Sequence, residues 1–154
     1  MPNIPAHTAK PRLTLSSRLS DLALVFPWVD DLAIEHCLSK DTVFAIHLCL
    51  EEALSNIIRH GYNGEPGHEL TVDVRIDGVS TLLFTIEDHA PHFVPPDPVE
   101  TPAVALPMPI EEFETGGQGL RLMRKFAGSL DWQPTPHGNR LTIGFPLASS
   151  PEPH

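Results

Sequence analysis

Basic residues, cysteines and long apolar runs are all scarce in this chain of 154 residues. The 10 Lys and Arg residues are outnumbered by 20 Asp and Glu residues, so the formal net charge is −10. Such an acidic chain lacks the basic footprint that nucleic acid or an anionic membrane requires, and we expect neither as a direct partner. No apolar run reaches the roughly 20 residues of a membrane span. The N-terminal stretch also lacks the apolar core of a signal peptide.

The low cysteine content points to a reducing compartment. The two cysteines, Cys37 and Cys49, cannot build a disulfide framework, and free thiols are typical of the cytoplasm. Hydrophobic residues make up 41% of the chain and charged residues 19%, which is the composition of a folded globular domain. The sequence therefore predicts a cytoplasmic protein with one ordinary domain and its own core.

Proline is abundant, and its placement divides the chain. Seven of the 17 prolines fall between positions 91 and 109, where a long helix or strand would not survive. A proline-rich loop of this length in a compact domain is usually functional or disordered, and we interpret about residues 89–115 as a lid. Residues 1–11 are predicted to be a flexible arm and residues 148–154 a flexible tail, which leaves a domain over residues 12–147.

One short strand and then helices are predicted in the first half of this domain. Residues 12–16 alternate between polar and apolar, as an edge strand does. Helical spacing begins at Ser20, and Pro27 either kinks one long helix or opens a second segment in its first turn. A long helix then runs from an expected N-cap at Asp41 to a stop at Gly61.

Strands dominate the second half of the domain. Alternation and turn signals place them at 69–77, 81–87, 130–133 and 140–146, with one helix at 120–126. The first two strands flank Asp77-Gly78, which is a strong hairpin signal. This order predicts an α+β fold, a two-layer α/β sandwich in which a mixed, mostly antiparallel sheet carries its helices on one face.

Three stretches around the proposed lid carry residues suited to ligand binding. Glu52 and Asn56 share one face of the long helix, where an amide oxygen beside a carboxylate suits a hard cation such as Mg²⁺. Asp88 follows a hydrophobic strand, and its carboxylate can accept a hydrogen bond from an exocyclic amine. The run Gly116-Gly117-Gln118-Gly119 opens a helix, where amides and the helix dipole favour phosphate. Taken singly, each has an ordinary explanation without a ligand: a solvated helical pair, a turn-starting Asp and a flexible hinge.

The order of these stretches resembles the GHKL (Bergerat) ATP-binding fold, and it is most similar to the bacterial anti-sigma-factor serine/threonine kinases. The matching stretches are EEALSNIIRHGY (51–62), EDHAPHF (87–93), GGQGLRLM (116–123) and GNRLTIGF (138–145). The resemblance implies an ATP-dependent serine/threonine protein kinase that binds ATP/ADP with Mg²⁺. It also implies a sigma factor and a STAS-type anti-anti-sigma protein as partners, the latter as the substrate, and a homodimer.

The resemblance further implies a role for each matching residue. Glu52 would be the general base, and Asn56 would bind the nucleotide through Mg²⁺ as the metal ligand. Asp88 would bind the adenine amino group. The remaining nucleotide-binding residues would be His60, Ala90, Gly117, Gly119, Leu120 and Asn139.

Three departures from the family pattern keep more than one function open. Ala90 stands where the family often has glycine, and it fits easily only if its φ is negative. Asn139 stands where many members have threonine. No Lys or Arg in the motifs clearly holds the γ-phosphate: Arg121 and Arg124 are candidates, and solvated helix charges are the alternative reading of both. The main competing function is that of a catalytically silent nucleotide-binding regulator that sequesters a partner protein. A histidine-kinase catalytic domain and a domain that binds no nucleotide are two further hypotheses.

Overall fold

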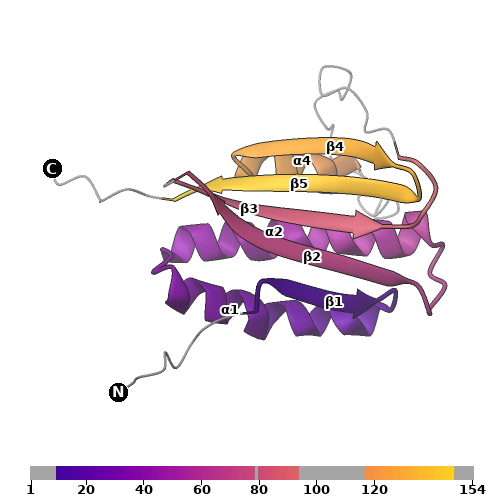
Figure 1. The fold of residues 1–154 in the computed structure, drawn as a ribbon, viewed down its shortest axis with the longest axis horizontal. Coiled ribbons are helices and arrows are strands. Elements are labelled where there is room, and N and C mark those ends of the chain that lie inside the picture. The colour runs from indigo at the N-terminus through magenta and orange to yellow at the C-terminus, as the bar shows by residue number, and fades with distance from the viewer. Residues whose placement is uncertain (1–9, 79, 94–116, 148–154) are drawn as a thin grey trace, which may run out of the picture.

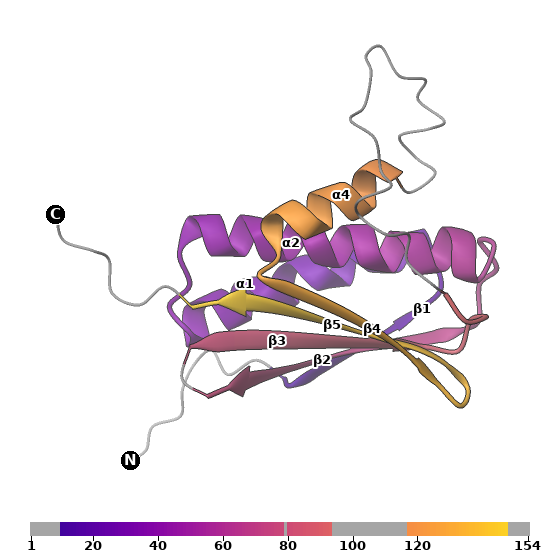
Figure 2. The ribbon, with the colours of Figure 1, turned by 90° about the horizontal axis from the view of Figure 1, so that it is seen from above.

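Two layers make up the described part of the molecule, a computed structural model that covers residues 10–78, 80–93 and 117–147. One layer is a five-stranded sheet, and the other is a set of helices on one of its faces (Figure 1 and Figure 2). The predicted two-layer α+β sandwich is confirmed. All pairings between the described strands are antiparallel, so the parallel component expected of a mixed sheet is not found among them. The predicted tail, most of the arm and all of the lid beyond Phe93 lie outside the described residues.

The sheet has the strand order β1-β2-β3-β5-β4. Its strands are β1 (Arg12–Ser16), β2 (Glu69–Asp77), β3 (Thr81–Asp88), β4 (Ser129–Thr135) and β5 (Gly138–Pro146). After β3 the chain passes through helix α4 (Gly117–Phe126) to the sheet edge at β4, and β5 then returns to pair with β3. This path places the end of β3 directly beside the start of β5, where Asp88 pairs with Asn139.

The helical layer consists of α4 together with α1 (Val25–Glu35), α2 (Lys40–Asn56), the 3₁₀ turn η1 (Leu19–Leu24) and the π-helical turn η2 (Ile57–Gly61). Pro27 lies in the first turn of α1, so it opens a helical segment rather than kinking one long helix. The expected N-cap at Asp41 is wrong, because the Ser39 hydroxyl accepts a hydrogen bond from the Thr42 amide at 3.1 Å and caps α2. Within the described part of the chain, no helix has the length and apolar character needed to cross a membrane.

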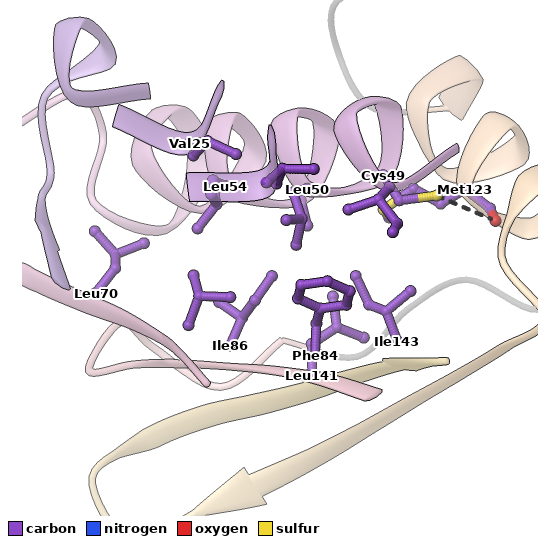
Figure 3. Packing of buried hydrophobic residues seen from close by; sticks show 14 of the residues in the cluster. Val25, Cys49, Leu50, Leu54, Leu70, Phe84, Ile86, Met123, Leu141 and Ile143 are labelled. Atoms are coloured by element: carbon purple, nitrogen blue, oxygen red, sulfur yellow. Dashed lines mark hydrogen bonds between the residues drawn. The ribbon is translucent and has the colours of Figure 1, made fainter. Parts of the chain in front are cut away.

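The hydrophobic core fills the space between the two layers (Figure 3). Alternate residues of the central strands, such as Phe84 and Ile143, point toward α2, which meets them with Leu50 and Leu54. Figure 3 also shows Met123 of α4 beside Cys49 of α2, with the thiol directed at the Met123 carbonyl oxygen. The helices α2 and α4 are thus packed side by side above the sheet, and the core continues to the end of the molecule where the pocket described next opens.

Candidate functional site

A pocket of about 610 Å³ opens between α2, α4 and the sheet, at the end where β3 finishes and β5 begins. A cavity of this size encloses a small organic ligand. Six of the predicted site residues line it: Asn56, His60, Asp88, Ala90, Leu120 and Asn139. These residues come from stretches that lie far apart in the sequence, and the fold brings them around one cavity.

Glu52 and Gly119 lie next to this pocket, where α4 crosses α2. A Cβ atom on Gly119 would overlap the Glu52 Oε1 atom and lie 3.8 Å from Asn56 Nδ2. The missing side chain therefore lets the first turn of α4 rest on the acid–amide pair of α2. Gly117 is the first residue of α4, while Gly116 falls outside the described residues.

The Glu52 carboxyl is partly buried at this crossing. Burial raises its pKa, the neighbouring charge of Glu51 raises it further, and Arg59 acts in the opposite direction. A carboxylate with a raised pKa is a better proton acceptor than an ordinary surface glutamate. The position of Glu52 beside the start of α4 therefore suits a general base.

Asp88 ends β3 inside the pocket and is only 4% exposed. Its Oδ1 atom accepts two hydrogen bonds of 2.9 Å, one from Asn139 Nδ2 and one from the Ala90 amide. Burial raises the pKa of this carboxyl, and the hydrogen bonds from Asn139 and Ala90 oppose the rise. The result is an acceptor held in one orientation on an otherwise apolar pocket wall.

Asn139 fastens the segment that follows β3. Its side-chain nitrogen donates to Asp88 and also to the Pro91 carbonyl oxygen at 3.0 Å, and its side-chain oxygen accepts from the Phe93 amide at 2.8 Å. Both ends of the amide are thus used within the protein, and the residue is 6% exposed. The geometry makes Asn139 a residue that positions Asp88, in addition to lining the pocket.

Close contacts explain why glycine occupies positions 61 and 138 at this end of the pocket. Ala90 is buried, and it is not among the described non-glycine residues with positive φ, so alanine fits at this position without strain. Its methyl group faces Gly61, where an added Cβ would lie 2.9 Å from Ala90 Cβ. Gly138 is required at the start of β5, because a Cβ there would overlap the Asp88 carbonyl oxygen and lie 2.6 Å from His89 Cα.

The π-helical turn η2 shapes the pocket wall beside the segment that follows Asp88, because Gly61 of the turn packs against Ala90. Such turns occur mostly as single-turn bulges of α-helices and are frequent at functional sites. Here the turn carries His60 and Gly61 into the pocket lining. The next residue, Tyr62, accepts a 2.7 Å hydrogen bond from the His89 amide through its hydroxyl oxygen. Burial raises the pKa of this phenol. Tyr62 therefore ties the end of the helical layer to the end of β3.

The sequence motifs do not include Phe93, Met123 or Trp132 among the site residues, although all three line the pocket. Trp132 pairs with Leu141 across β4 and β5, and both side chains face the helices. The alternation that begins at Leu130 is the sequence signal that could have placed Trp132 there.

The nearby Cys49 thiol is buried, which raises its pKa to about 12, with a smaller contribution from Glu52. This thiol is therefore inert at neutral pH.

The donor set fits a magnesium ion that is shared with phosphate. Among the described residues, no group of three or more His, Cys, Asp or Glu side chains is placed to hold a metal. Asn56 lines the pocket and carries one amide oxygen, with Glu52 one helical turn away beside Gly119. Mg²⁺ accepts such a sparse set of oxygen ligands, because it keeps several waters and takes its other ligands from substrate phosphates.

Comparison with known proteins agrees with this geometry. The Histidine kinase-like ATPase domain family matches residues 15–145. The serine/threonine-protein kinase BtrW of Bordetella bronchiseptica is 31% identical over 117 residues, which are 75% of this chain and 79% of that protein.

Two solved structures share the fold. The RsbU and RsbW domains of Rv1364c from Mycobacterium tuberculosis superpose with a TM-score of 0.58 at 14% identity, over 92% of this chain and 34% of that one. The histidine kinase domain of the Erythrobacter litoralis EL346 blue-light activated kinase gives 0.50 at 17% identity, over 92% of this chain and 66% of that one. The chain thus spans about a third of the first of these structures. With the family matched from the first strand to the last, this chain belongs to the histidine kinase-like ATPase domain family.

Proposed function

We propose that this protein is an ATP-dependent serine/threonine protein kinase of the anti-sigma-factor type, which phosphorylates a STAS-type anti-anti-sigma protein. The observation that carries the proposal is that Asn56, Asp88 and Leu120 line one pocket, with Glu52 held beside it under Gly119. The 31% sequence identity with a serine/threonine-protein kinase, over 75% of this chain, supports the choice of phosphoryl transfer to Ser or Thr. The proposed ATP-binding domain covers residues 12–147, and its proposed location is the cytoplasm.

The nucleotide is proposed to lie with its base at the sheet end of the pocket and its phosphates at the crossing of α2 and α4. Asp88 offers a fixed acceptor for the exocyclic amine of adenine. The first turn of α4 offers backbone amides and the positive end of the helix dipole to phosphate. Asn56 would hold Mg²⁺ through its side-chain oxygen, and the ion when bound supplies charge neutralisation at the phosphate oxygens.

Phosphoryl transfer then needs one proton to be moved by the protein. The attacking Ser or Thr hydroxyl forms a bond to the γ-phosphorus, the bond to the ADP oxygen breaks, and Glu52 takes the hydroxyl proton. Glu52 acts only in its ionised form, and its pKa is raised by burial. The transfer rate is therefore expected to rise with pH through that raised pKa, and the acid limb lies above the ordinary range of a glutamate.

The proposal is tested by mixing the purified protein with labelled Mg-ATP and candidate STAS proteins, and by measuring label on the STAS protein. Glu52→Gln should bind ADP as the wild type does but lose at least about a hundredfold in transfer rate, which is the usual contribution of a general base. Glu51→Gln is the matched control, because Glu51 is the exposed neighbour on the same helix. It should transfer at the wild-type rate above the acid limb, and the limb itself should move to lower pH, because the charge of Glu51 contributes to the raised pKa of Glu52.

Three outcomes would contradict the proposal. Tight ATP binding without label transfer to any STAS protein would leave the catalytically silent regulator as the better description. If Glu52→Gln controlled a sigma-factor partner as the wild type does, phosphoryl transfer would not be needed for that control. An absence of ADP binding in calorimetry would remove the nucleotide itself from the proposal.

A further inference from the structure

An aromatic pair stands at the mouth of the pocket, on the sheet side. Phe93, in the segment after β3, and Trp132 of the edge strand β4 have ring centroids 6.0 Å apart, with their planes tilted by 51°. Both rings line the pocket. Phe93 is 49% exposed, so a face of its ring is accessible to a ligand in the pocket.

The strand register fixes where the Trp132 side chain points. Trp132 pairs with Leu141, and Leu141 pairs with Ile86, so all three side chains face the helices. Asp88 lies two residues beyond Ile86 and faces the same way. The indole and the Asp88 carboxylate therefore belong to one surface, separated by two strand spacings, roughly 10 Å across the sheet, and by two residues, roughly 7 Å along the strands.

The segment that carries Phe93 is held against the β4–β5 hairpin by several contacts. The Phe93 amide donates to Asn139, and the Asn139 side chain donates back to Pro91. The His92 Nε2 atom donates to the Thr135 carbonyl oxygen at 3.0 Å. These bonds fix the backbone that carries the Phe93 ring before any ligand arrives, which lowers the ordering cost when a flat ligand binds.

We propose that Trp132 and Phe93 form an aromatic platform, in which the purine ring of the nucleotide stacks on the Trp132 indole and the Phe93 ring, tilted by 51° from the indole, contacts the purine at an angle. The proposal rests on the proposed function, because it takes the ligand to be a purine nucleotide whose amine meets Asp88. A purine presents a polar edge and a flat aromatic ring. The Asp88 carboxylate suits the polar edge, and the Trp132 indole suits the flat ring.

Stacking and edge recognition make separable contributions. A stacked indole holds any purine, since every base has a π-face, whereas the Asp88 carboxylate accepts only from a base with an amine at the matching position. The platform therefore sets how tightly a purine is held, and Asp88 sets which purine is preferred. This division gives a readout that a purely structural role of Trp132 would not produce.

Intrinsic fluorescence tests the platform directly, because the chain has only two tryptophans. Trp28 lies in the core, where its indole donates to the Lys10 carbonyl oxygen and its ring meets Phe84 edge-on. ADP should change the fluorescence of the wild type, and the change should vanish in Trp132→Phe, which keeps a ring and should bind ADP within about threefold of the wild type.

Calorimetry with ADP and GDP then separates stacking from selection. Trp132→Leu should weaken ADP and GDP by a similar factor of about ten or more, so that the preference between them is unchanged. Phe93→Leu, on a half-exposed side chain, should weaken both by a smaller factor and guards against a folding defect at Trp132. Phe44→Leu is the control, because Phe44 is an exposed aromatic on α2 outside the pocket and should leave both affinities unchanged.

The platform is overturned if ADP binds the wild type in calorimetry without any response of Trp132, or if Trp132→Leu binds ADP within about twofold of the wild type. A loss in Trp132→Leu that is confined to ADP would also contradict it, because stacking does not select between purines. If the wild type binds neither nucleotide, the proposed function and the platform fall together.

Discussion

At the scale of single residues, Asp88 carries a conflict between stability and binding. Its carboxylate is buried, which disfavours the ionised form, yet the ionised form is the stronger acceptor for a ligand amine. Asn139 and the Ala90 amide soften the conflict, because both donate to the same oxygen. A raised folded-state pKa means that this group favours the fold at low pH, and that this contribution is lost as the pH rises through the raised value.

Asp88→Asn should therefore separate the two properties. The Oδ1 atom of asparagine can accept both existing hydrogen bonds, and the neutral side chain removes the cost of burying a charge. We expect the ligand-free variant to unfold at the same or a higher temperature than the wild type at pH 7, with the difference shrinking as the pH falls. Its ADP affinity should drop by more than about tenfold, since a charge-assisted hydrogen bond is lost. An unchanged preference for ATP over GTP would contradict the assigned role of Asp88.

Asn139 is the residue on which the geometry around Asp88 depends most. Asn139→Ala removes the donor to Asp88 and the acceptor for the Phe93 amide. We expect a loss of about 2 kcal/mol in the free energy of unfolding by urea, from two or more buried hydrogen bonds of about 1 kcal/mol each. Arg140→Ala is the matched control on the same strand, because it breaks only the surface ion pair with Glu87 and should cost less than about 1 kcal/mol. Equal costs for the two variants would show that Asn139 is an ordinary strand residue.

At the scale of elements, the sequence predicts best where local chemistry decides the outcome. The strand over 69–77 and the position of Gly61 agree with the structure, because alternation and turn residues act locally. The predicted loop after residue 133 is mostly strand, with a tight turn at Pro136 and His137. Pro134 is tolerated there because β4 is an edge strand that pairs only with β5.

The candidate site shows the same division between local and non-local information. Asn56 and Asp88 can be predicted from motifs that each lie within one element. Phe93 and Trp132 cannot, because their contact depends on the register of β4 against β5 and on the path of the chain after β3. A register shift of one residue would turn the indole to the opposite face of the sheet.

The crossing of α2 and α4 gives a prediction at the element scale. An alanine inside a helix is normally more stable than glycine by about 1 kcal/mol. At Gly119 the added methyl group meets the end of the Glu52 side chain, which is flexible and can move aside. Gly119→Ala should therefore remain folded, with an unfolding temperature near that of the wild type, while phosphoryl transfer falls at least about tenfold because Glu52 is displaced.

Gly138→Ala provides the contrast for that prediction. Its methyl group would meet the backbone of Asp88 and His89, which cannot swing away as a side chain can. We expect a loss of stability of more than about 2 kcal/mol in urea unfolding. If Gly119→Ala proved as destabilising as Gly138→Ala, the glycine would be needed for the packing of α4 on α2 and not for the position of Glu52.

At the scale of the whole molecule, the pocket belongs to both layers. The sheet supplies Asp88 and Trp132, and the helices supply Asn56 and Leu120, so the site disappears when the layers separate. A ligand that bridges the layers binds the folded state alone and must stabilise it by mass action. The unfolding temperature is therefore a direct measure of whether both layers contribute to binding.

Mg-ADP at about 100 times its dissociation constant should add about 2.7 kcal/mol to the stability of the wild type. For a domain of this size, that gain raises the unfolding temperature by roughly 5–10 °C. Asn56→Ala should keep the ligand-free unfolding temperature within a few degrees, because its side chain faces the pocket, but should lose the shift with Mg-ADP. Lys40→Ala, at the exposed opposite end of α2, should show the full shift. A full shift in Asn56→Ala would mean that Asn56 does not bind the nucleotide and that the helical layer contributes to binding through other residues.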